Sequence, residues 1–224
     1  MVQDRYIEWL LRSGALRFGE FKTKSGRLSP YFFNTGCFDS GQSLGGIAEL
    51  YAEVIAERFG NKVENLFGPA YKGIPLAVMT SYHLSNRLGR DISYTFNRKE
   101  AKDHGEGGTL VGRNYRGGER VVLVEDVITG GTSFREMRPI LESCKVEVVG
   151  VVVGVDRQER GTDHRSALVQ VAEDWQVPTA CLVTVSEVVH RLHGREVLGR
   201  VWIDDATKAR IDDYLATYGG SSAR

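Results

Sequence analysis

The sequence predicts an α/β fold with a mainly parallel sheet and helices on both faces. Two short valine-rich runs, Val146 to Val155 and Ala180 to Val185, have the length and composition of parallel strands buried on both faces. Apolar runs of strand length alternate along the chain with segments of helical periodicity, which is the order of βαβ units. A chain of 224 residues can bury a core of that kind, and neither a repeat nor a linker divides it, so residues 1–224 are expected to form one domain.

Each element follows from a local signal. The first helix is expected from about Asp4 to Leu16, with apolar residues at helical spacing, Asp4 as the N-cap and Gly14 near its end. The segment FKTKSGRLSPYFFNTG, which follows, is rich in turn-forming residues. The remaining elements, in chain order, are a helix over 43–59, a strand over 65–68, a helix over 73–88, strands over 92–97 and 120–126, and helices from about 132 and near 166–175.

Two segments depart from this alternation. Residues 99–118 combine many glycines with charge and have very little apolar content, which predicts a long mobile loop. Loops of that length inside a compact domain are usually functional or disordered. The final residues, GGSSAR, are expected to form a frayed tail over 219–224.

Composition restricts the partners and the compartment. The 29 basic and 29 acidic residues cancel, so no global field attracts nucleic acid or an anionic membrane. No apolar run approaches the roughly 18 residues of a membrane-spanning helix. The three cysteines lie far apart without metal-ligand spacing, which fits buried thiols in a reducing compartment rather than a disulfide or zinc framework. The protein is expected to be soluble and cytoplasmic, without nucleic-acid or membrane partners.

The segment RVVLVEDVITGGTSFRE places a strand, an acid pair and a Thr/Gly turn directly before a helix. In an open parallel sheet, ligands bind beyond the carboxyl ends of strands, where Glu125 and Asp126 are expected to meet the hydroxyls of a sugar. Glycines in the turn allow close approach of a phosphate to the free amides at the helix N-terminus. The phosphate-binding turn thus comprises Thr129, Gly130, Gly131, Thr132 and Ser133.

Other interpretations of this glycine pattern are weaker. An ordinary strand-to-helix turn capped by threonine and serine remains an alternative, although the acid pair at the strand end argues against it. Gly112 and Gly117 have the spacing of a nucleotide-hydrolase phosphate loop, but Gly118 stands where lysine is needed. No GxGxxG follows a strand, so dinucleotide binding also loses support.

The segment VVLVEDVITGGTS resembles the signature of type I phosphoribosyltransferases that binds phosphoribosyl pyrophosphate (PRPP). FKTKSGRLSPYFFN and FNRKEAKDHGEGG are similar to orotate phosphoribosyltransferases in particular, and GPAYKGIP and DRQERG extend the resemblance to about Gly161. One departure is Glu125, where many members have aspartate. The resemblance implies the type I phosphoribosyltransferase fold, with a small N-terminal hood over about 1–40 and a mobile catalytic loop, or lid, over about 98–118.

The family implies the PRPP site. Its acid pair holds the ribose hydroxyls, its turn holds the 5'-phosphate, and GPAYKGIP holds pyrophosphate through Lys72 and backbone amides. A solvated surface cation is the alternative for Lys72. The residues expected to bind PRPP are Lys24, Tyr71, Lys72, Arg98, Lys99, Lys102, His104, Glu125, Asp126, Val127, Ile128, Thr129, Gly130, Gly131, Thr132 and Ser133.

The catalytic residues implied by the resemblance are Lys102, His104 and Asp126. Lys102 and His104 belong to the lid and would contact the departing pyrophosphate in the neighbouring subunit's site, so a homodimer with shared sites is expected. A disordered charged hairpin is the alternative for this segment. Charge-assisted hydrogen bonds contribute about 1.5 to 3 kcal/mol, more than the roughly 0 to 1 kcal/mol of an exposed ion pair, so a closed lid would strengthen these contacts.

For orotate, the resemblance points to Lys24, Thr129, Arg157 and the backbone at Phe32 and Phe33. The planar guanidinium of Arg157 matches a carboxylate in a bidentate manner. Its alternative is a surface ion pair with Asp156 or Glu159, and Phe32 and Phe33 also fit core positions.

The resemblance implies that Mg²⁺ is the cofactor. It would be held mainly by PRPP and water, because no dedicated set of protein ligands is apparent. A purine phosphoribosyltransferase would share the PRPP turn but not the two orotate-type segments. A PRPP-sensing regulator that binds nucleic acid is disfavoured by the neutral net charge.

Overall fold

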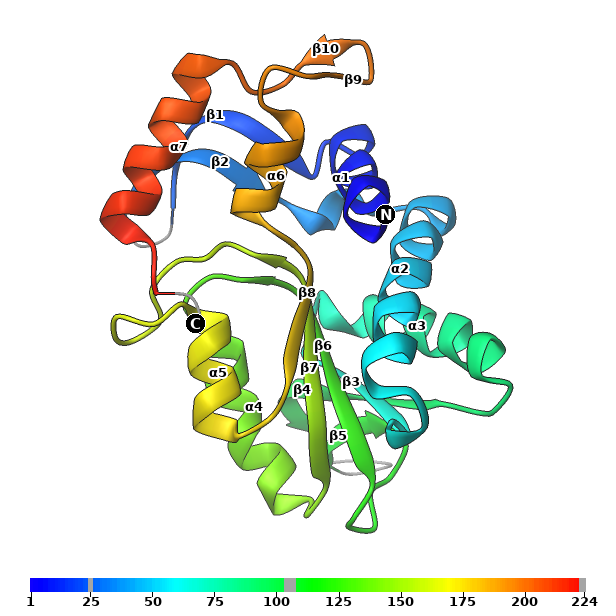
Figure 1. The fold of residues 1–224 in the computed structure, drawn as a ribbon. Coiled ribbons are helices and arrows are strands. Elements are labelled where there is room, and N and C mark those ends of the chain that lie inside the picture. The colour runs from blue at the N-terminus through cyan, green and yellow to red at the C-terminus, as the bar shows by residue number, and fades with distance from the viewer. Residues whose placement is uncertain (24–25, 103–107, 222–224) are drawn as a thin grey trace.

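The computed structural model describes residues 1–23, 26–102 and 108–221. Its centre is a sheet in which the described residues form six strands in the order β5-β4-β3-β6-β7-β8 (Figure 1). All neighbours are parallel except β4 and β5. The strands are β3 (Asn65–Gly68), β4 (Ser93–Lys102), β5 (Gly108–Gly112), β6 (Arg120–Ile128), β7 (Glu147–Asp156) and β8 (Thr179–Thr184). The predicted mainly parallel α/β sheet is confirmed.

Helices cover both faces of this sheet (Figure 1). On one face lie α2 (Gly41–Phe59) and α3 (Gly73–Leu88), and on the other lie α4 (Thr132–Ser143) and α5 (Ala167–Trp175). The side chains of β6 alternate between the two layers: Val122 and Val124 pack in one core cluster, and Val121 and Leu123 in the other. Each such fully buried aliphatic side chain contributes about 1.5 to 3 kcal/mol, which explains why the central strands are apolar on both faces.

The predicted hood is built from both ends of the chain. Its N-terminal part is α1 (Val2–Arg12), β1 (Leu16–Lys22), β2 (Leu28–Phe33) and the 3₁₀ turn η1 (Thr35–Cys37). The C-terminal elements α6 (Val185–Leu192), β9 (Glu196–Val197), β10 (Arg200–Val201) and α7 (Asp205–Tyr218) lie beside them, on the same side of the sheet (Figure 1). The rings of Tyr31 in β2 and Tyr214 in α7 join the two parts edge to face, with centroids 5.6 Å apart.

The predicted loop over 98–118 is wrong over much of its length. β4 continues to Lys102, and β5 returns antiparallel to it over residues 108–112, which leaves residues 103–107 outside the described chain. The charged end of β4 and the short β5, GTLVG, hid this hairpin, because its pairing is made by backbone hydrogen bonds and needs no long apolar run.

Two terminal predictions also need correction. The first helix begins at Val2, so Asp4 lies in its first turn, where it pairs with the terminal amino group of Met1 at 3.3 Å instead of capping. The predicted frayed tail is wrong for residues 219–221. The amide of Gly220 donates to Gln158 O at 2.9 Å, and the amide of Ser166 donates to Ser221 O at 3.0 Å. Backbone pairing fixes these small residues, which have no apolar side chains to reveal it in the sequence.

None of the helices in the described ranges is long and apolar enough to cross a membrane. The three cysteines are free in the described structure, and each is partly buried where buried thiols were expected.

Candidate active site

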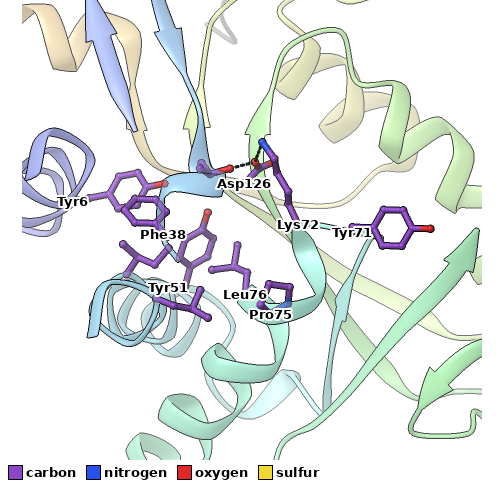
Figure 2. Close-up of a pocket in the computed structure, with 12 residues that line it drawn as sticks. Tyr6, Phe38, Tyr51, Tyr71, Lys72, Pro75, Leu76 and Asp126 are labelled. Atoms are coloured by element: carbon purple, nitrogen blue, oxygen red, sulfur yellow. Dashed lines mark hydrogen bonds and ion pairs between the residues drawn. The ribbon is translucent and has the colours of Figure 1, made fainter. Parts of the chain in front are cut away.

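The predicted acid pair lies at the carboxyl end of β6. Glu125 is buried, and its main-chain carbonyl accepts a hydrogen bond from Tyr51 Oη at 2.9 Å. Asp126 is partly exposed, and its Oδ1 accepts the amide of Val127 at 2.8 Å. Two bonds therefore fix the strand end and leave the Asp126 carboxylate pointing out of the sheet (Figure 2).

The buried acid, Glu125, has a perturbed pKa. Burial, and next the neighbouring charge of Asp126, raise the pKa of Glu125 well above its ordinary value. Glu125 therefore keeps a proton at pH values where an exposed glutamate is ionised. Asp126 is the member of the pair whose carboxylate is partly exposed at the strand end.

Asp126 meets two residues from distant parts of the chain. Lys72 precedes the first turn of α3 and places Nζ 3.4 Å from Asp126 Oδ2 (Figure 2). The hydroxyl of Thr35, in the hood turn η1, donates to the same oxygen. The alternative prediction for Lys72 was a solvated surface cation. Lys72 is half exposed, but it forms an ion pair with Asp126. The predicted sugar and pyrophosphate segments are thus adjacent.

These polar groups form one edge of a cavity of about 250 Å³. Tyr6 and Tyr51 lie across it, while the ring of Tyr71 points away from it (Figure 2). The lining residues are Tyr6, Thr35, Gly36, Phe38, Leu44, Ile47, Tyr51, Tyr71, Lys72, Pro75, Leu76 and Asp126. The phosphate turn and Arg157 are not among them, so a ligand that spans all predicted residues would lie across the strand ends rather than inside this apolar hollow.

The phosphate turn has the geometry expected of an anion site. Gly131 is the N-cap of α4 in the left-handed conformation, with φ of 70°, and no side chain of the described structure caps this helix end. The first amides of α4 therefore remain available to an anion. Arg135 donates from Nη1 to Gly130 O at 2.7 Å and from Nη2 to Thr132 Oγ1 at 3.1 Å. This arginine braces the turn, a role that the sequence analysis did not assign.

Among the other predicted PRPP residues, Tyr71 is exposed and Lys99 Nζ lies 5.2 Å from its ring centroid. Arg98 and Lys99 belong to β4, at the base of the hairpin. The side chain of Ile128 packs in the core, so any ligand contact it makes uses the backbone. Lys24 and His104 lie outside the described residues, and for Lys102 only the backbone, at the end of β4, is described.

Arg157 follows β7 directly beside the phosphate turn, and its amide donates to Ile128 O at 3.4 Å. The alternative for Arg157 was an ion pair at the surface. Arg157 does pair with Glu159, but both side chains are buried, so the predicted surface position is wrong. The guanidinium lies 4.8 Å from the ring centroid of Tyr31. Phe33 is buried, whereas Phe32 is 41% exposed and stacks on Phe21.

The predicted backbone contacts at Phe32 and Phe33 are compatible with the hood. Both residues lie in β2, opposite Arg17 and Leu16 of β1. Within the described chain this sheet has two strands, so one edge of β2 carries no neighbouring strand. Amide and carbonyl groups on that edge are available for a planar ligand.

The structure also places residues at the site that the sequence analysis did not single out. They are Thr35 beside Asp126, Arg135 over the phosphate turn, and Tyr214 near Arg157. Glu159 was considered only as a surface partner of Arg157, and the structure shows this pair buried beside the site. For Thr35 and Tyr214 no local pattern exists, because their partners are 91 and 55 residues away in the sequence.

Comparisons with known proteins agree with this geometry. The model of the phosphoribosyl transferase domain family matches residues 38–182. The orotate phosphoribosyltransferase of Clostridium beijerinckii is 46% identical over 218 residues, which cover 97% of each chain. That of Pseudomonas paraeruginosa is 47% identical over 217 residues, covering 97% of this chain and 98% of the relative. The crystal structure of orotate phosphoribosyltransferase from Francisella tularensis superposes with a TM-score of 0.80 at 34% identity, covering 96% of this chain and 99% of that one.

Proposed function

The chain belongs to the orotate phosphoribosyltransferases of the phosphoribosyl transferase domain family, and from this membership we propose the reaction that it catalyses. It transfers the 5-phosphoribosyl group of PRPP to orotate and gives orotidine 5'-monophosphate and pyrophosphate, a step of pyrimidine (UMP) biosynthesis. The enzyme is a glycosyltransferase of the pentosyltransferase type.

One juxtaposition carries the proposal. The uncapped N-terminus of α4, the Asp126 carboxylate and the Lys72 ammonium all lie at the carboxyl ends of neighbouring strands β6 and β3. An anion-binding helix end, a sugar-binding carboxylate and a cation at one sheet edge match the three parts of PRPP: 5'-phosphate, ribose and pyrophosphate. Arg157 adjoins this edge and supplies the guanidinium for the orotate carboxylate.

The reaction breaks the bond from ribose C1 to the pyrophosphate oxygen and forms a bond from C1 to orotate N1. The electron pair of the broken bond leaves with pyrophosphate, and the N1 anion of orotate supplies the new pair. Because positive charge develops on the sugar, the residues act by orientation and by electrostatic stabilisation. Asp126 orients the ribose hydroxyls, Lys72 neutralises pyrophosphate together with Lys102 and His104 of the lid, and the phosphate turn anchors the substrate.

Mg²⁺ fits this donor set. Within the described residues no group of three or more His, Cys, Asp or Glu side chains could enclose a metal, while the oxygen atoms near Asp126 suit a hard cation. PRPP oxygens and water would hold the ion, and Asp126 and the Thr35 hydroxyl are protein oxygens that could contribute. When bound, Mg²⁺ supplies charge neutralisation on the pyrophosphate group.

A homodimer with shared sites follows from the family and has support in the surface of this chain. Tyr82 of α3 and Tyr94 of β4 are exposed and line a hollow of about 420 Å³. Aromatic side chains are enriched in protein interfaces. Because α3 begins at the pyrophosphate segment and β4 leads into the lid, an interface here would bring the lid of one subunit near the site of the other. The three free cysteines support a reducing, cytoplasmic location.

The reaction is tested with the purified chain, Mg²⁺ and PRPP, following the absorbance of orotate, adenine or hypoxanthine. We expect orotate to be consumed, and only when Mg²⁺ is present. Asp126→Asn should lose most of the activity because it loses the charge opposite Lys72, whereas the exposed Asp39→Asn is the matched control and should keep it. Turnover of a purine without turnover of orotate by the folded protein would overturn the assignment.

A further inference from the structure

We propose that Glu159, held by Tyr214 of the C-terminal helix α7, is a positioning residue that fixes Arg157 for end-on binding of the orotate carboxylate. The inference rests on the proposed function and adds residues, a binding mode and a role for the C-terminal region to it.

The contacts define which edge of the guanidinium is used. Arg157 Nε donates to Glu159 Oε1 at 2.8 Å, and Arg157 Nη2 lies 2.5 Å from the same oxygen. The Nε/Nη2 edge is therefore occupied by Glu159. A carboxylate ligand can make two parallel bonds to a guanidinium either at that edge or at the Nη1/Nη2 end, so the end remains for orotate.

The end of the guanidinium retains an unused donor although the residue as a whole is buried. Arg157 Nη1 makes no hydrogen bond to a described residue. Among the residues that the structure describes, only Tyr31 Oη and Thr80 Oγ1 are fully buried side-chain N or O atoms without a hydrogen-bond partner. Arg157 Nη1 also lacks a partner but is not one of them, so Nη1 is not fully enclosed. Nη2 also donates to the buried Ser29 Oγ at 3.4 Å, a long hydrogen bond that the incoming carboxylate would replace.

Charge balance fits one carboxylate. Glu159 is 2% exposed and pairs with Arg27 as well, whose Nη1 lies 3.4 Å from Oε2. Two guanidinium groups and one carboxylate leave a net charge of about +1, which the single carboxylate of orotate would neutralise. Without Glu159, the two arginines would repel each other and Arg157 could turn away from the ligand.

The helix α7 completes this arrangement. Tyr214 Oη donates to Glu159 Oε1 at 3.0 Å, and the Tyr214 ring packs against Tyr31, which lies under the Arg157 guanidinium. The backbone pairing of residues 219–221 with 158–166 ties the end of α7 to the loop that carries Glu159. The C-terminal helix thus contacts Glu159, and Glu159 in turn contacts Arg157 at the proposed orotate site.

The test measures kcat and both KM values for four single variants and one double variant. Arg157→Lys reports the role of Arg157 itself. Glu159→Gln removes the charge, and Tyr214→Phe removes only the hydroxyl. Tyr218→Phe is the matched control, because Tyr218 lies one turn further along α7 and its hydroxyl makes no hydrogen bond within the described chain.

We expect Glu159→Gln to raise the KM for orotate by about tenfold to a hundredfold, as for loss of a charge-assisted contact, and to leave the KM for PRPP within about twofold. Tyr214→Phe should raise the orotate KM several-fold, and Tyr218→Phe should not. Because Glu159 acts through Arg157, adding Glu159→Gln to Arg157→Lys should raise the orotate KM little further.

Equal changes in both KM values, or fully additive effects in the double variant, would show that Glu159 supports the fold and would overturn the inference. If Glu159→Gln does not fold, an unchanged orotate KM in Tyr214→Phe overturns it equally. A normal orotate KM in Arg157→Lys would overturn the placement of orotate at Arg157, and the inference with it, while wild-type turnover of orotate would leave the proposed reaction standing.

Discussion

Two adjacent residues at the end of β7 are buried in different electrostatic environments. Arg157 is compensated by Glu159, whereas the Asp156 carboxylate accepts the amide of Gln158 at 2.8 Å. Burial raises the pKa of Asp156 to about 6, and the hydrogen bond from Gln158 only partly opposes this. The native protein therefore binds a proton at Asp156 at pH values where the unfolded chain has released it.

This difference makes stability depend on pH. The contribution of Asp156 is fully present below its ordinary pKa of 3.8 and is lost as the pH rises through about 6. Asp156→Asn keeps an oxygen for the Gln158 amide and cannot ionise. Relative to wild type, its free energy of unfolding should increase between about pH 4 and pH 6 by up to roughly 3 kcal/mol, since one pKa unit corresponds to about 1.4 kcal/mol.

Chemical denaturation of both proteins at a series of pH values measures this difference. An unfolding free energy difference that stays constant from pH 4 to pH 7 would contradict a raised pKa at Asp156.

At the scale of elements, the two glycines of the turn between β6 and α4, Gly130 and Gly131, have different roles. Gly131 has a φ of 70°, and a Cβ there would lie 3.3 Å from Arg135 Nη1. Gly130 does not have positive φ, and a Cβ there would meet no described atom within 4 Å. Gly131 is thus required by the backbone conformation, whereas the fold leaves Gly130 free to serve the approach of a ligand.

Alanine substitutions separate these roles. Gly131→Ala should lower the free energy of unfolding by about 1 to 2 kcal/mol and also weaken PRPP binding, because the left-handed conformation is strained for alanine. Gly130→Ala should leave stability unchanged and weaken PRPP binding by roughly tenfold or more, as expected for loss of one charge-assisted bond to phosphate. Thermal unfolding and calorimetric titration with PRPP measure the two effects.

Gly118→Ala is the control for strain. Its φ is +87°, and no described atom lies within 4 Å of its Cβ position, so it should lose stability without loss of PRPP affinity. Full PRPP affinity in Gly130→Ala would mean that the 5'-phosphate does not approach this turn.

At the scale of the whole molecule, the shared-site dimer makes a complementation prediction. Lys102→Ala damages the lid and Asp126→Asn damages the sugar site, so each protein alone should be nearly inactive. When lids act on the neighbouring subunit, a mixed dimer contains one intact site. Random exchange at equal concentrations makes about half of the dimers mixed, and activity should recover to roughly a quarter of wild type.

Native mass spectrometry supplies the control, because it reports subunit exchange independently of activity. Confirmed exchange with activity still at the level of the separate variants would show that the lid serves its own subunit.

The sequence by itself determined the α/β class, the strands of the parallel sheet up to the hairpin, and the phosphate turn with its acid pair. These features are encoded by contiguous residues: the apolar run of β6, Glu125 and Asp126, and the glycines before α4. Local periodicity and turn chemistry are sufficient for them, since strand burial and helix ends are properties of short segments. The resemblance then named Arg157 and Lys72 as site residues, and Glu159 was considered only as a surface partner of Arg157.

Only the tertiary structure decided which side chains meet. Thr35 and Lys72 reach Asp126 from the hood and from α3, and Tyr214 reaches Glu159 from the last helix. It also decided that residues 108–112 form an edge strand and that the C-terminal residues 219–221 are paired. The physical reason is common to all of these features. They depend on hydrogen bonds between segments far apart in the chain, and the distance between such segments is fixed by packing rather than by any local pattern.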